Sequence, residues 1–147
     1  MSLTCLIKKS KEEPLKHIMD YTSSSQTIFN EILELDLKKT PSSPFVFNKI
    51  NPNTFEPFRM LNKLNLYGNQ IASLDLNTFS SLINLKEMDL SENCLVRLDA
   101  NIFQNLICLT KLLLAKNQIV YIDVNAFNGL TNLEELCLDY NALCDIR

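Results

Sequence analysis

Residues 61–84 read LNKLNLYGNQIASLDLNTFSSLIN, residues 85–108 read LKEMDLSENCLVRLDANIFQNLIC, and residues 109–132 read LTKLLLAKNQIVYIDVNAFNGLTN. All three follow one 24-residue pattern, L-x-x-L-x-L-x-x-N-x-[I/L]-x-x-[L/I]-x-x-x-x-F-x-x-L, with Met88 in place of one leucine. A fourth copy begins at Leu133 and continues to Ile146. At an apolar content of 46%, chance does not fill so many apolar positions in the same register three times. The chain is therefore organised as tandem repeats.

Each copy predicts a short strand, a turn and a return segment. Leucines two residues apart on a strand point to one face, so pairs such as Leu64 and Leu66 are expected to enter a core. The asparagine that follows can satisfy backbone groups that a tight turn leaves unpaired. Stacked copies then align four asparagines, Asn69, Asn93, Asn117 and Asn141, and four phenylalanines, Phe55, Phe79, Phe103 and Phe127, which fill the wider side of each coil.

This pattern resembles the leucine-rich repeat family, in particular its 24-residue class with phenylalanine in the return segment. The resemblance covers about residues 32–146. It implies an α/β solenoid, a right-handed coil with a parallel β-sheet on the concave side and irregular or 3₁₀ segments on the convex side. It also implies that partners bind the concave strand face.

The chain divides into an N-terminal segment and the repeats. Residues 1–31 do not fit the pattern; a capping box at Ser10 and Glu13 favours a short helix that caps the solenoid, and a disordered leader is the alternative. Residues 32–60 form an irregular repeat with five extra residues in a Pro- and Ser-rich loop over 38–46. Full repeats follow at 61–84, 85–108 and 109–132, and a partial repeat at 133–147.

Composition and cysteine placement indicate the compartment and exclude some partners. Net charge is -3 and no long basic run occurs, so neither nucleic acid nor an anionic membrane is the expected partner. No signal peptide and no apolar run of membrane-spanning length is visible. One repeat away from Cys94, Cys108, Cys137 and Cys144 there is no other cysteine, so disulfides are not expected. The chain as written is expected in the cytoplasm; a truncated chain would instead be secreted or displayed on the cell surface.

No catalytic, metal or cofactor site is predicted. His17 is the only histidine and lies outside the repeats, and Gly68 and Gly129 are the only glycines, which leaves no phosphate-binding loop. An Asp-x-Asn motif recurs before three of the phenylalanines. One carboxylate per coil does not assemble a calcium site, so the motif is read as a cap on a short helical segment.

The outward positions of the strands are the predicted partner-binding site. They form three columns: Glu34, Lys63, Glu87, Lys111 and Glu135; Asp36, Asn65, Asp89, Leu113 and Cys137; Lys38, Tyr67, Ser91, Ala115 and Asp139. The first column alternates in sign, which also fits a solvated ladder of ion pairs with no partner. Leu113 is apolar although it is predicted to point away from the core, and with Ala115 and Tyr67 it is the predicted anchor for a partner.

The repeats predict a non-enzymatic protein-binding module. The alternative is a ligand-sensing or regulatory part of a larger receptor, or of a repeat-bearing kinase or GTPase. Because the last repeat is incomplete, its coil is expected to expose apolar residues and strand groups. A longer chain would cover them, or the open coil would associate with a second copy.

Overall fold

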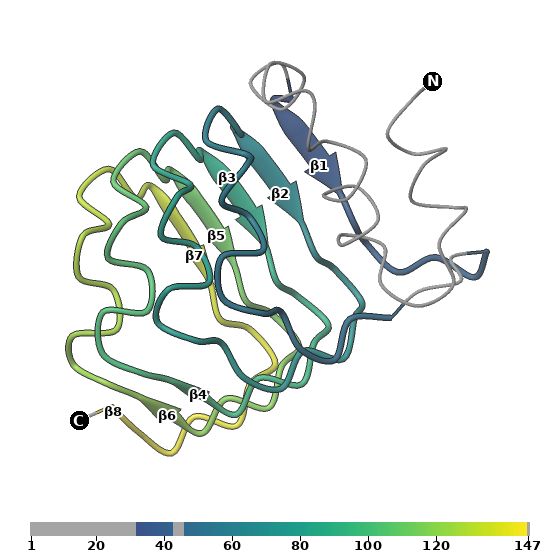
Figure 1. Ribbon diagram of the computed structural model, residues 1–147. Coiled ribbons are helices and arrows are strands. Elements are labelled where there is room, and N and C mark those ends of the chain that lie inside the picture. Colours follow the sequence, from purple (N-terminus) through teal and green to yellow (C-terminus); the bar gives the residue numbers. More distant parts are fainter. Residues whose placement is uncertain (1–31, 43–45, 147) are drawn as a thin grey trace.

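The computed structural model describes residues 32–42 and 46–146 (Figure 1). The predicted cap over 1–31 lies outside these residues. Five short strands form one parallel sheet in the order β1 (Glu34–Asp36), β2 (Lys63–Asn65), β3 (Glu87–Asp89), β5 (Lys111–Leu113) and β7 (Glu135–Cys137). Figure 1 shows the coils, each a strand with its return segment, stacked side by side. The predicted parallel solenoid is confirmed.

The strand register follows the repeat. Lys63 pairs with Glu87, Glu87 with Lys111, and Lys111 with Glu135, so neighbouring strands are offset by one 24-residue copy. Glu34 pairs with Lys63, and the first coil therefore holds the five extra residues. In that coil Lys39 N–H still donates to the Tyr67 carbonyl at 2.9 Å. The longer loop thus leaves the sheet register intact.

A second parallel sheet, absent from the sequence prediction, joins the return segments. It consists of β4 (Arg97–Leu98), β6 (Tyr121–Ile122) and β8 (Asp145–Ile146), each two residues long. Val96 and Val120 precede β4 and β6, and β-branched residues favour extended backbone. Strands of two residues are too short to show the alternation by which strands are found in a sequence.

The return segments contain turns, and no residue of the described part lies in a helix. Ala126 N–H donates to the Asp123 carbonyl at 2.9 Å, and Asn125 N–H donates to Asp123 Oδ1 at 2.8 Å. The Asp-x-Asn motif therefore closes a turn, and the prediction that it caps a helical segment is wrong. Nor does the described part hold a helix long and apolar enough to cross a membrane.

The core is a continuous apolar stack. The strand leucines Leu64, Leu112 and Leu114 are buried, as is Met88 at the equivalent position of β3. Phe55, Phe79, Phe103 and Phe127 stack with ring centroids 6.0, 6.3 and 6.3 Å apart and planes within 18° of parallel. Burying a side chain of this size contributes about 1.5–3 kcal/mol, so the stack holds the coils at a common spacing.

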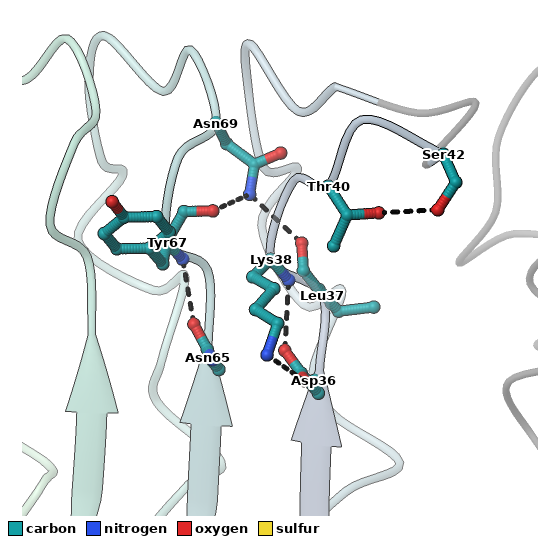
Figure 2. A network of polar contacts seen from close by, with 8 residues as sticks. All are labelled: Asp36, Leu37, Lys38, Thr40, Ser42, Asn65, Tyr67 and Asn69. Carbon is teal, nitrogen blue, oxygen red and sulfur yellow. Dashed lines mark hydrogen bonds and ion pairs between the residues drawn. The ribbon is translucent and has the colours of Figure 1, made fainter.

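The asparagines join each coil to its neighbours through side-chain hydrogen bonds. Asn93 Nδ2 donates to the Leu66 carbonyl of the preceding coil and to the Leu90 carbonyl of its own, both at 3.0 Å. Its Oδ1 accepts from Ile71 N–H of the preceding coil at 3.0 Å. Asn69, Asn117 and Asn141 make the equivalent bonds, and Figure 2 shows Asn69 reaching the Leu37 carbonyl. No buried side-chain nitrogen or oxygen of the described residues lacks a partner.

We expect Asn93→Ala to lower the free energy of unfolding by about 1–3 kcal/mol, because the buried Ile71 N–H would lose its acceptor. The matched control is Asn84→Ala, where only exposed bonds are lost, to the Arg59 carbonyl and to Met60 Sδ. Urea denaturation of both variants measures the difference. Equal destabilisation by the two substitutions would contradict a structural role for the asparagine ladder.

Replacing each of the two glycines by alanine is expected to lower the free energy of unfolding by different amounts. Both have positive φ, +72° at Gly68 and +87° at Gly129. A Cβ at Gly68 would make only ordinary contacts, with Lys39 Cβ at 3.6 Å and the Lys39 carbonyl oxygen at 3.8 Å, whereas a Cβ at Gly129 would lie 2.1 Å from the Gln104 carbonyl oxygen. Gly68→Ala should therefore cost about 1–2 kcal/mol from backbone strain alone. Gly129→Ala should cost roughly 1–3 kcal/mol more, and thermal melting of the two variants checks this order.

Candidate binding surface

The outward side chains of the five-stranded sheet, in the three columns predicted above, form what we call the outer face. The register places the members of the first two columns side by side on adjacent strands. Backbone bonds such as Gly68 N–H to the Ser91 carbonyl continue this alignment into the third column. Within the first column Lys63 Nζ lies 2.6 Å from Glu87 Oε2, and Lys111 Nζ lies 2.7 Å from Glu135 Oε2. These hydrogen-bonded carboxylates raise the pKa of both lysines. Four of the five residues in this column thus form two exposed ion pairs, which solvent screens.

In the second column, polar side chains form turns that end the strands. Asn65 Oδ1 accepts from Tyr67 N–H at 3.0 Å, and Asp89 Oδ1 accepts from Ser91 N–H at 2.8 Å. Asp36 Oδ1 does the same for Lys38 N–H at 3.3 Å, and Figure 2 shows the Asp36 and Asn65 turns in adjacent coils. A side-chain oxygen that bonds the backbone two residues later makes an Asx-turn. Asn65 and Asp89 therefore have a structural task in addition to any contact with a partner.

Leu113 breaks this rule, as does Cys137 one coil later. Leu113 stands in the column of Asn65 and Asp89 but has no acceptor for the N–H of Ala115. Both Leu113 and Ala115 are half-buried, and Leu113 lies between Asp89 on one neighbouring strand and Cys137 on the other. Neither belongs to the core cluster. The result is an apolar spot in the outer face where earlier coils place polar groups. Ser91, another predicted contact, is only 8% exposed and is less accessible than expected.

A ridge of four residues borders the outer face and was missed by the sequence prediction. Gly68, Glu92, Lys116 and Tyr140 occupy one repeat position, and all have positive φ, between 53° and 72°. A non-glycine residue in this conformation is strained by about 1–2 kcal/mol. Tyr140 is nevertheless 81% exposed. Gly68 could have revealed this ridge from the sequence, because a glycine at one copy of a repeat position indicates that the equivalent residues adopt a left-handed backbone conformation.

Tyr67, Glu92 and Lys116 form a polar network between this ridge and the third column. Lys116 Nζ donates to Glu92 Oε1 at 2.6 Å, and the Tyr67 hydroxyl is hydrogen-bonded to the same carboxylate. These bonds, from Lys116 first and then Tyr67, lower the pKa of Glu92. They raise the pKa of Lys116 and of Tyr67. The network ties three successive coils together beside the apolar spot.

Other chemistry is sparse in the described part of the chain. It contains no group of three or more His, Cys, Asp or Glu side chains that could hold a metal, and Cys94, Cys108, Cys137 and Cys144 are free thiols. One hollow lies between two return segments, lined by Asn53, Glu56, Arg59, Ser80, Ser81 and Ile83. Its two hydroxyls already donate to the carbonyls of Phe55 and Asn77. This arrangement offers no converging set of reactive groups.

The stacked parallel coils and the regular outer face define a repeat solenoid with an accessible strand surface. The leucine rich repeat family matches residues 59–119. A crystal structure of a TLR13–ssRNA13 complex is similar, with 27% sequence identity and a TM-score of 0.59. No curated protein matches the chain.

Residues 59–119 therefore carry leucine-rich repeats, and the stacked coils have the fold of that family. The similarity to TLR13 covers 68% of this chain and 18% of the TLR13 chain. Leucine-rich repeats of this kind are protein-binding or receptor-like modules, and typically not enzymes.

The Tyr67–Glu92–Lys116 network predicts a pH dependence. Because the folded pKa of Glu92 is depressed, its contribution to stability is present above the ordinary glutamate range. That contribution is lost as the pH falls through the folded pKa. NMR titration of the Glu92 carboxyl carbon should give a midpoint below that of a free glutamate, and Lys116→Gln should raise it. A midpoint that Lys116→Gln leaves unchanged would contradict the network.

Proposed function

We propose that the chain is a non-enzymatic module that binds a protein partner on the outer face, with Leu113 and Ala115 as the anchor. The observation that carries this proposal is the replacement of a strand-closing Asx residue by Leu113. The preceding coils show what the fold needs at that position, and leucine does not supply it. An apolar residue on a sheet surface without a core contact is the type of residue that anchors interfaces.

The surrounding residues would form the rest of the contact surface. Ion-paired Lys63, Glu87, Lys111 and Glu135, together with Asn65, Asp89, Tyr67, Ser91, Cys137 and Asp139, would set complementarity around the anchor. Charged pairs at an interface rim govern orientation and association rate more than affinity. Because short strands locked by the asparagine ladder hold these side chains, little conformational entropy would be lost on binding.

A second candidate function is ligand sensing within a larger receptor. The similarity to TLR13 favours it, because 68% of this chain superposes on a segment of a receptor that was crystallised with single-stranded RNA. This second function would use the same outer face as the first, but it would involve a different class of ligand.

Leu113→Asn tests the proposed anchor without damaging the fold. An asparagine here can accept from Ala115 N–H as Asn65 does from Tyr67 N–H, so we expect stability within about 0.5–1.5 kcal/mol of the parent protein. Binding to a protein partner captured from extracts of the source cells should weaken about 30-fold or more, as expected for an interface hot spot. Isothermal titration calorimetry with the purified partner measures the change.

Val124→Asn is the matched control. Val124 is 74% exposed in a return segment, outside the strands of the outer face, so its replacement makes the same apolar-to-amide change away from the proposed site. It should leave affinity unchanged. If Leu113→Asn retains full affinity, or if Val124→Asn weakens binding equally, the outer face is not the binding site.

A further inference from the structure

The lysines of the outer face are already neutralised. Lys38 Nζ lies 3.2 Å from Asp36, and Lys63 and Lys111 are paired with Glu87 and Glu135. On the adjoining ridge, Lys116 is paired with Glu92. Lys39 and Lys86 lie outside these columns. The cations of this surface are thus all engaged within the molecule and are not available to an acidic ligand.

Two carboxylates next to the anchor are left without a cation. Asp89 and Asp139 take part in no ion pair among residues 32–42 and 46–146. Asp89 pairs in register with Leu113, and Asp139 lies one coil beyond Ala115, where Lys116 N–H donates to its carbonyl at 2.8 Å. The apolar spot therefore lies between two carboxylates, one at the end of β3 and the other two residues beyond the end of β7.

The distance between the two carboxylates is close to the spacing of side chains along an extended partner strand. Two strand separations and two residues along a strand place Asp89 and Asp139 roughly 12 Å apart. In an extended segment, residues i and i+4 are about 13 Å apart, and residues i, i+2 and i+4 point to the same side. A single extended strand can thus present two end residues to the carboxylates and the middle residue to Leu113.

We propose that the partner presents an extended segment with the pattern basic-x-apolar-x-basic, its apolar side chain packing on Leu113 and Ala115 and its basic side chains pairing with Asp89 and Asp139. This inference rests on the proposed function and names the chemistry of its partner. The exposed Tyr140 ring, adjacent in sequence to Asp139, adds an aromatic face for a lysine or arginine. A polyanion such as RNA would instead meet these carboxylates and find no free lysine in the columns.

The test uses short synthetic peptides with neutral Gly-Ser flanks. The probe carries Lys-Ser-Leu-Ser-Lys, and three matched peptides carry Glu-Ser-Leu-Ser-Glu, Lys-Ser-Ser-Ser-Lys or the respaced Lys-Lys-Leu-Ser-Ser. Fluorescence anisotropy should show the probe binding about tenfold or more tightly than each matched peptide, with an affinity that falls as salt rises. A single-stranded RNA oligonucleotide is measured in parallel.

Charge-only variants locate the contact. Asp89→Asn keeps the Asx-turn, as Asn65 shows in the preceding coil, and Asp139→Asn has nearly the same shape as the parent side chain. The double variant should bind the probe about tenfold more weakly, with a flatter salt dependence. The control, Glu56→Gln with Asp75→Asn, makes the same change in net charge in the return segments and should bind like the parent.

Three results would overturn the inference: no measurable binding of the probe at about 1 mM, equal or tighter binding of the acidic peptide or the RNA, or full affinity in the Asp89→Asn, Asp139→Asn protein. None of them bears on the proposed function, which fails only if the captured protein partner is indifferent to Leu113→Asn. Loss of that partner with Leu113→Asn but not with the double variant would leave the outer face as the site and refute the basic segment.

Discussion

The asparagine hydrogen bonds between coils are the interaction on which the rest of this structure depends. Asn93 and its equivalents each donate to carbonyls in two coils and accept one N–H from the coil before. Tight turns otherwise bury backbone groups that cannot reach water, at a cost of about 1–3 kcal/mol each. By satisfying these groups across the coil boundary, the asparagines make the 24-residue step obligatory. The leucine core and the phenylalanine stack can then repeat at that step.

A consequence is that folding and recognition use different residues. The core takes alternate strand positions, and the remaining positions of each strand point away from it with few constraints. Where the outer face does have a structural task, in the Asx-turns of Asn65 and Asp89, the sequence keeps Asn or Asp. Leu113 is released from that task. The contrast within one column separates the proposed anchor from side chains that the fold itself requires.

Much of the architecture could be predicted from the sequence, because identical spacing imposes identical neighbours. The parallel register and the solenoid fold follow from the 24-residue period.

The second sheet could not be predicted, since strands of two residues show no alternation of buried and exposed side chains. Neither did the left-handed ridge ending in Tyr140, which depends on backbone conformation that only Gly68 signals. The Asp-x-Asn motif was read as a helix cap because a local pattern cannot distinguish a single turn from the start of a helix. For the outer face, sequence reasoning predicted its members and the alternating charges of the first column, but not how those charges pair or which Asp residues remain unpaired.

The direction of the asparagine bonds also bears on how the protein is made. The acceptor for Ile71 N–H is Asn93, 22 residues later in the chain, and the same interval separates Leu95 from Asn117. A coil emerging from the ribosome therefore lacks part of its hydrogen bonding until the next coil has been synthesised. At about 5–20 residues per second, each coil remains incomplete for roughly 1–4 seconds. Nascent chains of this protein accordingly carry one unfinished coil at their growing end throughout translation.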